Sequence, residues 1–326
     1  MLGNILVVGG AGYIGSTMVR TLLAQGYTPV VFDNLSTGHQ DFIPEEVTFV
    51  KGDLKNFFDI CTVFKNKKIE AVMHFAASSL VPESVENPLK YYDNNVLACI
   101  NLLKAMIENK VNKFIFSSTA AVYGEPRRVP IKEDDLKNPT NPYGHSKIII
   151  EKILEDISNS YDFAYIALRY FNAAGAHSEG GIGEKHDPET HLIPNILKVL
   201  TGEKEEITVF GDDYATPDGT CLRDYIHVDD LCSAHLLALN KLIATEKSEV
   251  FNLGSGDGYS VKQVIEMAER VTGQKVNLKI GKRRPGDPEK LVASSEKAQR
   301  VLGWQAKLTL EDIVSSAWNW EKKQNK

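Results

Sequence analysis

A tyrosine and a lysine stand four positions apart in the segment Tyr143-Gly144-His145-Ser146-Lys147. On a helix this spacing places both side chains on one face. A phenol with a pKa of about 10 is a poor base at neutral pH, but a nearby ammonium stabilises the phenolate. Lowering that pKa to about 7 needs about 4 kcal/mol, which two close cations in a partly desolvated site can supply. The pair predicts a general base, although surface helices also carry this spacing by chance.

Three hydroxyl side chains, Ser117-Ser118-Thr119, directly follow the apolar run Phe114–Phe116. If the run is a strand of a parallel sheet, these hydroxyls lie at its C-terminal edge, where open α/β sheets bind their ligands. Thr119 could then hydrogen-bond a reacting hydroxyl and relay its proton. The alternative is a strand end that is merely rich in serine.

A glycine-rich turn lies near the start of the chain, in Gly9-Gly10-Ala11-Gly12-Tyr13-Ile14-Gly15. The apolar run Ile5–Val8 before it predicts a strand, and the pattern from about Ile14 to Gln25 predicts a helix that Gly26 ends. Glycines permit a close approach of the backbone to a pyrophosphate, whose charge the N–H groups at the helix start would face. The strand-turn-helix order favours a dinucleotide cradle over a purely structural turn.

Two acidic residues follow the next expected strands, Pro29–Phe32 and Val47–Val50. Asp33 comes 18 residues after Gly15, where a carboxylate accepts hydrogen bonds from the ribose hydroxyls of NAD and would repel the extra phosphate of NADP. Asp53, in Gly52-Asp53-Leu54, would lie near the adenine. The pair Asp33-Asn34 is also good turn chemistry, which is the structural alternative.

Short apolar runs alternate with helical patterns through the first half of the chain. This rhythm predicts the α/β class, with a doubly wound parallel (Rossmann) sheet and a smaller mixed α/β substrate domain. The remaining expected strands of the first half are Ala71–Phe75, Phe114–Phe116 and Ala164–Leu168, and the expected helices are Pro88–Asn109 and Tyr143–Asp156.

The composition changes after about Tyr170. Residues 172–191 are rich in Gly, His, Asp and Glu and predict a long irregular segment, which is uncommon unless it is functional. We expect an NAD-binding domain over residues 1–170, to which residues 220–255 return, and a substrate domain over residues 171–326. The expected elements of the second half are Leu192–Leu200, Ile207–Phe210, Asp229–Leu242, Val250–Leu253 and a helical tail from Ser294.

The bulk properties are those of an ordinary globular protein. The chain has 326 residues, and its net charge of −6 with no long basic stretch argues against nucleic acid as a partner. No stretch approaches the roughly 20 apolar residues that span a bilayer, so a membrane is not expected. The four cysteines lack metal-binding spacing and suit a reducing compartment, so we expect a cytoplasmic protein without a metal. They are Cys61, Cys99, Cys221 and Cys232.

The chain resembles the extended short-chain dehydrogenase/reductase family nearly from end to end. The glycine turn, Asp33, Asp53, Ser117-Ser118-Thr119 and the pair Tyr143 and Lys147 occur in that family's order and spacing. Its second half is similar to the members that act on UDP-sugars. The motifs that carry this closer similarity are Arg169-Tyr170-Phe171-Asn172, His191-Leu192-Ile193-Pro194, Gly211-Asp212-Asp213-Tyr214, Arg223-Asp224-Tyr225-Ile226-His227-Val228 and Arg283-Arg284-Pro285-Gly286-Asp287.

The resemblance implies roles for individual residues. Tyr143 would be the catalytic base, Lys147 would orient NAD and tune Tyr143, and Thr119 would assist at the sugar 4-hydroxyl. NAD would be bound by Gly9, Gly12, Tyr13, Ile14, Gly15, Asp33, Asn34, Asp53, Leu54, Phe75, Ala76, Ala77, Asn95, Ser117, Tyr143, Lys147 and Tyr170. The UDP-hexose would be bound by Thr119, Asn172, His191, Leu192, Val209, Phe210, Arg223, Tyr225, Arg284, Asp287 and Leu291.

Elementary chemistry agrees with part of this set. A guanidinium binds phosphate oxygens in a bidentate manner, so Arg223 and Arg284 suit a diphosphate, with a surface salt bridge as the ordinary alternative for each. Asp287 could accept a hydrogen bond from a ribose hydroxyl. Ser79 departs from the family, which often has a lysine there near the NAD phosphates. Leu291 stands where side-chain bulk limits the sugar pocket, and its intermediate size leaves activity on UDP-GlcNAc and UDP-GalNAc open.

The resemblance also implies a reaction, the reversible inversion of UDP-glucose and UDP-galactose at C4. Tyr143 would remove the proton of the 4-hydroxyl while hydride passes to tightly bound NAD, and the 4-keto sugar would turn and take the hydride back on its other face. A 4,6-dehydratase needs an acid and a base beside Thr119, and Ala120-Ala121 can supply neither. The same absence weakens a UDP-glucuronate decarboxylase.

Two further expectations concern partners. An NAD-binding sensor without activity would not need Thr119, Tyr143 and Lys147 together, which makes this alternative weaker than an enzyme. The family implies a homodimer built on the helices Pro88–Asn109 and Tyr143–Asp156. Both helices carry apolar residues, but a face buried in the core would look the same.

Overall fold

The computed structural model describes residues 2–284 and 288–324 of the chain. The chain divides into two compact units, each assembled from stretches that are separate in sequence. Unit 1 comprises Met1–Gly124, Leu136–Arg169 and Cys232–Phe251. Unit 2 comprises Glu125–Asp135, Tyr170–Leu231 and Asn252–Lys326.

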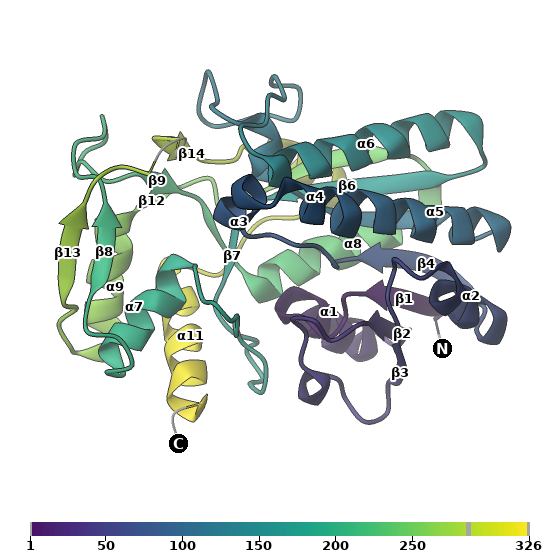
Figure 1. Cartoon of the computed structure of the whole chain (residues 1–326), viewed down its shortest axis with the longest axis horizontal. Helices are drawn as coiled ribbons and strands as arrows, with labels where there is room; N and C mark the ends of the chain where they lie inside the picture. The colour runs from purple at the N-terminus through teal and green to yellow at the C-terminus, as the bar shows by residue number, and fades with distance from the viewer. Residues whose placement is uncertain (1, 285–287, 325–326) are drawn as a thin grey trace. The chain divides into compact units, whose positions relative to one another are not determined.

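A seven-stranded parallel sheet, in the order β3-β2-β1-β4-β5-β6-β11, forms the centre of unit 1 (Figure 1). Its strands are β1 (Asn4–Val8), β2 (Thr28–Asp33), β3 (Thr48–Lys51), β4 (Ile69–His74), β5 (Lys113–Thr119), β6 (Ala164–Tyr170) and β11 (Glu249–Leu253). The order reverses between β1 and β4, the place where open α/β sheets bind ligands at the carboxyl ends of their strands. The predicted doubly wound fold is confirmed.

Helices cover both faces of this sheet (Figure 1). On one face lie α1 (Tyr13–Ala24) and α8 (Val228–Thr245), where Cys232 Sγ is 3.8 Å from the Ile14 carbonyl oxygen. The other face is covered by α2 (Phe57–Asn66), α5 (Ala98–Glu108) and α6 (Pro142–Ser160). Apolar side chains of these helices and of the strands form one core there, which explains why the strands were recognisable as short apolar runs.

The helix expected over Pro88–Asn109 is divided. It consists of α4 (Pro88–Tyr91), a π-helical stretch η2 (Tyr92–Leu97) and α5, and the short helix α3 (Val81–Glu86) precedes it. The π-helical stretch carries Asn95, which is fully buried. Such wide turns are rare and frequently occur at functional positions.

Unit 2 contains small sheets rather than one large sheet. Strand β7 (Asn172–Ala174) pairs with β10 (Tyr225–His227), β9 (Leu222–Arg223) lies between β12 (Tyr259–Ser260) and β14 (Lys290–Leu291), and β8 (Ile207–Phe210) pairs with β13 (Leu278–Gly281). Helices α7 (Leu192–Leu200), α9 (Val261–Thr272) and α11 (Leu310–Gln324) share one apolar core. Neither α9 nor β13 was predicted, although a capping box of Ser260 and Gln263 marks the start of α9.

The expected helical tail is two helices, α10 (Glu296–Leu302) and α11. Gly303 ends α10 with a left-handed φ of 67°, a conformation that glycine commonly supplies at a helix C-terminus. The Asp230 carboxylate then accepts hydrogen bonds from the N–H groups of Lys307 and Leu308, both at 2.8 Å, and fixes the connection.

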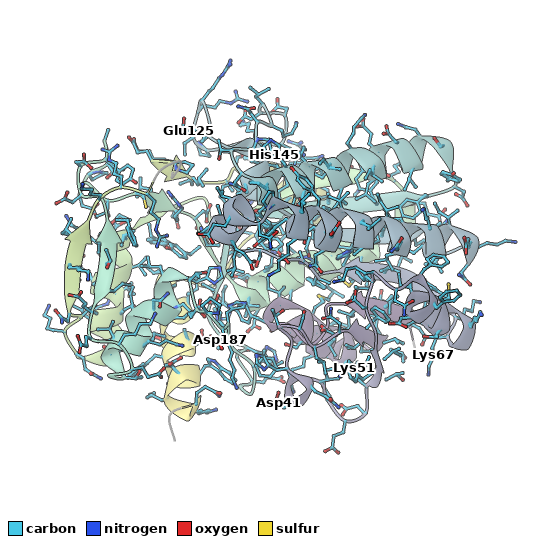
Figure 2. All side chains as sticks on the ribbon, in the orientation of Figure 1. Asp41, Lys51, Lys67, Glu125, His145 and Asp187 are labelled. Carbon is cyan, nitrogen blue, oxygen red and sulfur yellow. The ribbon has the colours of Figure 1, made fainter. Side chains whose placement is uncertain are left out.

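Short 3-10 turns complete the described elements, η1 (Gln40–Phe42) and η3 (Ala120–Tyr123). Charged side chains at the margin of unit 1, such as Lys51 and Lys67, point into solvent (Figure 2). None of the helices within the described ranges is both long and apolar enough to cross a membrane.

Candidate active site

The glycine turn connects β1 to α1 and leaves no room for a Cβ at Gly9 or Gly15. Gly9 has a positive φ of 78°, and a Cβ there would lie 2.5 Å from the Ala76 backbone nitrogen. A Cβ on Gly15 would lie 2.1 Å from the Gly9 carbonyl oxygen. α1 begins at Tyr13, its N-cap residue Gly12 offers no side-chain cap, and its first turn carries no acidic residue, so its positive end has no capping carboxylate of its own. This cradle fits the pyrophosphate of a dinucleotide.

Asp33 ends β2, and backbone donors fix its carboxylate. Oδ2 accepts a hydrogen bond from the Ala11 N–H (3.0 Å) and Oδ1 accepts one from the Leu35 N–H (2.8 Å). A second carboxylate is linked to the same strand end, because Asn34 Nδ2 donates to Asp53 Oδ2 at 3.2 Å. Carboxylate oxygens accept more than one hydrogen bond each, so the pair can also take the hydroxyls of a ribose.

The loop after β4 carries the expected contacts Phe75, Ala76 and Ala77, and it is tied down at both ends. The Phe75 N–H donates to the Val8 carbonyl oxygen at 2.8 Å, beside the glycine turn. Asn95 accepts from the Ser78 N–H (2.8 Å) and donates to the Ser78 carbonyl oxygen (3.0 Å). The buried amide of Asn95 therefore holds this loop in place.

The other expected NAD contacts are distributed over neighbouring elements. Tyr13 and Ile14 open α1, Leu54 follows Asp53 into the core, and Tyr170 is the last residue of β6. The Ser117 hydroxyl lies 3.3 Å from His235 Nε2. Apart from Tyr170, which belongs to unit 2, these contacts all belong to unit 1.

Thr119 and Tyr143 meet where β5 ends and α6 begins. The two side chains are hydrogen-bonded, and Thr119 is 7% exposed. Asn141 caps α6 by accepting the Gly144 N–H at 2.9 Å, which sets Tyr143 in the first turn. Burial raises the pKa of the Tyr143 phenol, and the hydrogen bond with Thr119 opposes that rise.

Lys147 lies one turn further along α6 and is 3% exposed. Its Nζ donates to the Ser117 carbonyl oxygen at 2.8 Å and lies 4.9 Å from the centroid of the Phe116 ring. Burial lowers the pKa of its ammonium to about 8. In the chain by itself the pKa of Tyr143 is thus raised, opposite to the direction expected from Lys147, because burial dominates.

A buried ion pair on the same helix face was not predicted. Glu151 continues the four-residue spacing of the catalytic pair, and its Oε1 accepts from Arg169 Nε (2.9 Å) and from Ser118 Oγ (2.6 Å). Arg169 Nη1 donates to the Tyr123 hydroxyl at 2.7 Å. The network joins α6 to β5 and β6, directly beside the strand end that carries Thr119. The repeated spacing was the readable signal.

Four of the expected substrate contacts in unit 2 lie on paired strands. Asn172 of β7 pairs with Tyr225 of β10, and Asn172 Nδ2 donates to the Asp224 carbonyl oxygen at 2.9 Å. Arg223 of β9 pairs with Leu291 of β14. Arg223 and Leu291 are partly exposed, whereas Tyr225 is buried and packs in the core of the unit.

Asp224 holds these strands together, a role that its motif did not reveal. Its buried carboxylate accepts hydrogen bonds from the N–H groups of Ser255 (2.7 Å), Gly256 (3.1 Å) and Ala293 (3.0 Å). Four groups, with the Ser255 hydroxyl, therefore satisfy one carboxylate in the interior of unit 2.

Phe210 and Arg284 form a second group in unit 2. The guanidinium carbon of Arg284 lies 3.9 Å from the centroid of the Phe210 ring, and Arg284 is exposed. A guanidinium stacked in this way keeps its donors for a phosphate. Val209, the preceding residue of β8, is buried in the core instead. The expected contact Asp287 lies outside the described residues.

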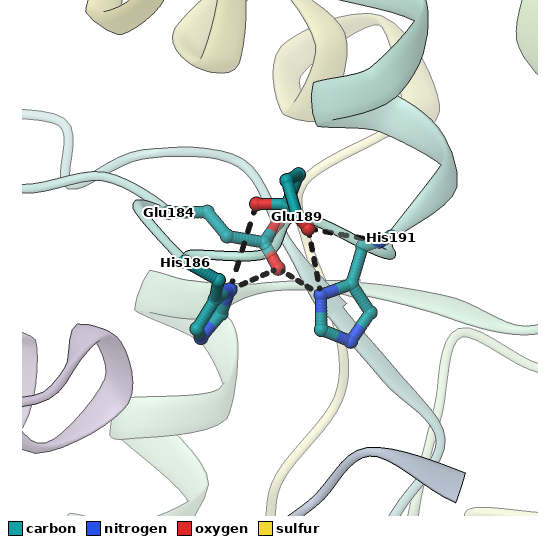
Figure 3. Close-up of side chains that lie close together, drawn as sticks. All are labelled: Glu184, His186, Glu189 and His191. Atoms are coloured by element: carbon teal, nitrogen blue, oxygen red, sulfur yellow. Dashed lines mark hydrogen bonds and ion pairs between the residues drawn. The ribbon is translucent and has the colours of Figure 1, made fainter. Parts of the chain in front are cut away.

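His191 and Leu192 lie where α7 begins, with His191 as the N-cap residue. His191 Nδ1 is 2.6 Å from Glu184 Oε1 and 3.3 Å from Glu189 Oε1 (Figure 3). Burial by itself lowers the pKa of His191, but the two carboxylates outweigh burial and raise it to about 10. These partners were not predicted, although the spacing Glu-x-His-x-x-Glu-x-His is visible in the sequence.

Comparison with known proteins gives consistent matches. The model of the NAD dependent epimerase/dehydratase family matches residues 5–254. The UDP-glucose 4-epimerase of Halalkalibacterium halodurans is 53% identical over 319 residues, covering 98% of this chain and 95% of that protein. A crystal structure of UDP-glucose 4-epimerase gives a TM-score of 0.97 at 51% identity, covering 99% of this chain and 98% of that one. The UDP-glucose 4-epimerase from Brucella ovis in complex with NAD gives 0.95 at 46% identity, covering 98% of both.

Proposed function

Because this chain belongs to the NAD-dependent epimerase/dehydratase family, we propose that it interconverts UDP-glucose and UDP-galactose by inversion at C4. The observation that carries the proposal is the hydrogen-bonded pair of Thr119 and Tyr143, with the buried Lys147 one turn away. Full-length relatives with this activity in their names support it.

The chemical roles fall to residues of unit 1. Bound NAD supplies a hydride acceptor and, on return, a hydride donor. Tyr143 takes the proton of the sugar 4-hydroxyl and later gives it back. Thr119 hydrogen-bonds the same 4-hydroxyl. An ammonium has three donors, so Lys147 can orient the cofactor and lower the pKa of Tyr143 while one donor remains on the Ser117 carbonyl.

The same unit would hold NAD. The glycine turn and the N-terminal end of α1 would receive the pyrophosphate, and Asp33 would accept the ribose hydroxyls. Asp53 would lie at the adenine end. Ser79, where the family often has a lysine, is exposed, so the backbone of the glycine turn would carry more of the pyrophosphate binding.

Unit 2 would hold the UDP moiety. Arg223 and Arg284 would bind the diphosphate, and Asn172, Leu192 and Phe210 would surround the remainder of UDP. The sugar must be able to turn between the two hydride transfers, so firm contacts belong to UDP and not to the hexose. Leu291, paired with Arg223, would set the size limit for the sugar.

A direct test incubates the purified protein with UDP-galactose and identifies the product. We expect UDP-glucose to form without net consumption of NAD. The variant Tyr143→Phe should lose this conversion while retaining NAD. Full activity of Tyr143→Phe would show that the base is assigned wrongly, and a 4-keto-6-deoxy product would identify a dehydratase instead.

The acceptance of N-acetylated sugars is a second candidate function, which the intermediate size of Leu291 leaves open. UDP-GalNAc assayed beside UDP-galactose would measure it. A rate on UDP-GalNAc within about tenfold of that on UDP-galactose, or about 1.4 kcal/mol, would make the protein a bifunctional epimerase.

We also propose a homodimer built on α4, η2 and α6. These elements and α3 are in contact in unit 1 and expose large apolar side chains: Val81, Val85, Leu89, Leu97 and Ile149. Clustered apolar groups on one unit mark protein–protein interfaces. Sedimentation analysis would show a dimer, which Leu89→Asp should weaken.

The four cysteines are all unbonded, which supports a cytoplasmic location.

A further inference from the structure

Four metal-ligating side chains of unit 2 converge in the irregular segment before α7. They are Glu184, His186, Glu189 and His191, and each offers one ligand atom within 4.8 Å of all the others (Figure 3). The carboxylate side chains are only 7% and 3% exposed, whereas the two imidazoles are 29% and 44% exposed. The carboxylates therefore form the buried side of the cluster, and the imidazoles form the side that solvent can reach.

Two separations between ligand atoms of the cluster fit four-coordinate geometry. Zn²⁺ binds histidine nitrogen and carboxylate oxygen at about 2.0–2.2 Å, which puts tetrahedral ligand atoms about 3.3–3.6 Å apart. His186 Nδ1 is 3.4 Å from Glu184 Oε1 and 3.6 Å from Glu189 Oε2. His191 Nδ1 is 2.6 Å from Glu184 Oε1, and this distance would have to open by about 0.8 Å.

One nitrogen of the cluster, His186 Nδ1, makes only long contacts with its carboxylate neighbours, at 3.4 and 3.6 Å. His186 Nδ1 is buried and has no hydrogen-bond partner among the described residues. Glu189 Oε1 already accepts the N–H groups of Thr190 and His191, both at 2.8 Å, which leaves Oε2 toward His186. One oxygen of Glu189 is thus fixed by the backbone while the other faces the centre of the cluster.

The backbone around the cluster is also fixed. The Glu184 carbonyl oxygen accepts from the Trp320 indole N–H at 3.1 Å, and the Glu189 and His191 carbonyl oxygens accept from Asn195 Nδ2 at 3.3 and 2.8 Å. These contacts fix the backbone that carries three of the four side chains.

We propose that Glu184, His186, Glu189 and His191 bind one divalent transition-metal ion of the Zn²⁺ class. The carboxylates favour protonated imidazoles in the metal-free chain, so metal binding would release a proton from each imidazole to solvent. Two carboxylates and two neutral imidazoles would then balance the charge of the ion and fill a tetrahedron, so that no position is left for substrate and the site is structural. The ion would join the two ends of the segment 184–191 and so fix the start of α7. Cysteine spacing alone predicts no metal, because the proposed ligands are histidines and glutamates.

An ion-pair network without metal is the competing interpretation. The number of metal ions bound per chain distinguishes it from a metal site. The full-length protein is treated with a chelator, freed of it, mixed with ZnCl₂ and passed through a desalting column. We expect about one Zn²⁺ per chain by mass spectrometry of the metal, and a melting temperature raised by a few degrees. Replacement by Co²⁺ should give the intense visible bands of four-coordinate cobalt.

Matched variants locate the ion. His186→Gln and Glu184→Gln should each lose the retained Zn²⁺ and the rise in melting temperature. His177→Gln is the control, because His177 is also in a carboxylate pair (Nδ1 2.7 Å from Asp229 Oδ1) but lies outside the cluster. Retention of Zn²⁺ by His186→Gln, its loss in His177→Gln, or less than about 0.2 equivalents in the unmodified chain would each overturn the proposal. Metal content and melting are read without substrate, so failure here leaves the proposed epimerisation untouched.

Discussion

The charged groups proposed for catalysis in unit 1 and those proposed for substrate binding in unit 2 differ in burial. In unit 1, Lys147, Glu151 and Arg169 are almost completely buried, and each is held by protein groups at hydrogen-bond distance. In unit 2, Arg284 is exposed and rests on the ring of Phe210, and the imidazole of His191 is 44% exposed.

This difference separates two physical tasks. Proton and hydride transfer need groups that do not reorganise, and burial supplies that rigidity at the cost of desolvation. A diphosphate brings its own charge, so the guanidinium groups proposed to bind it can remain exposed to solvent at little cost. Changes in unit 1 should therefore affect catalysis and stability strongly, and changes to the exposed charges of unit 2 should affect binding more weakly.

The largest expected effect is on catalysis in unit 1. Tyr143 is the proposed proton acceptor, so Tyr143→Phe should lower kcat for UDP-galactose about 10²- to 10⁴-fold. The ring and its packing against Tyr91 are kept, and the melting temperature should change little. Tyr161→Phe, at an exposed tyrosine, is the control. A decrease in kcat of less than tenfold in Tyr143→Phe would contradict the assignment of catalysis to the buried groups of unit 1.

The next effect is on stability. Glu151→Ala leaves the Arg169 guanidinium buried without its carboxylate, and breaking such a pair costs about 3–4 kcal/mol of unfolding free energy. Urea unfolding of the variant and of Lys152→Ala would measure it. Lys152 makes exposed ion pairs with Glu155 and Asp156 one turn away on the same helix, so its loss should matter little. Equal effects of the two substitutions would contradict the importance of burial.

Much of unit 1 was predictable because local patterns decide it. The strands were visible as apolar runs, and the spacing of the glycine turn is typical of a backbone that lies close to a pyrophosphate. The expected fold and family are both confirmed. Glu151 was not predicted, since its importance comes from Arg169, Ser118 and Tyr123, which are distant in sequence.

Unit 2 was predicted less completely for the same reason. Its strands are short and pair with partners far along the chain, so β13 and the role of Asp224 depend on tertiary contacts that no local pattern contains. The site assignments remain predictions in both units. The limit of sequence-based prediction is clear in the cluster of Glu184, His186, Glu189 and His191. The spacing of these residues is visible in the sequence, but the convergence of their side chains is not.

A pH dependence would sharpen the contrast further. The pKa of Lys147 is lowered to about 8 by burial, below about 10.4 in an unfolded chain. Below pH 8 both states hold the proton and the full cost of burying it is present. Between these pH values unfolding takes up a proton, so stability rises with pH, by about 3 kcal/mol in total. The unfolding free energy of the unmodified chain minus that of Lys147→Met should rise accordingly between pH 7 and pH 10. A flat difference would mean that Lys147 is not buried as a cation.

The smallest expected effect lies in unit 2, where two adjacent arginines provide their own control. Arg284→Ala should raise KM for UDP-galactose about tenfold, or about 1.4 kcal/mol, and leave kcat nearly unchanged, because a diphosphate contact is equal in the ground and transition states. Arg283 is already engaged by Asp213, with Nε 2.6 Å from Oδ1, so Arg283→Ala should change KM less. If Arg284→Ala instead lowered kcat and left KM unchanged, its guanidinium would act in the chemical step. Catalytic charges would then occur in both units, and the assignment of catalysis to unit 1 and of binding to unit 2 would be wrong.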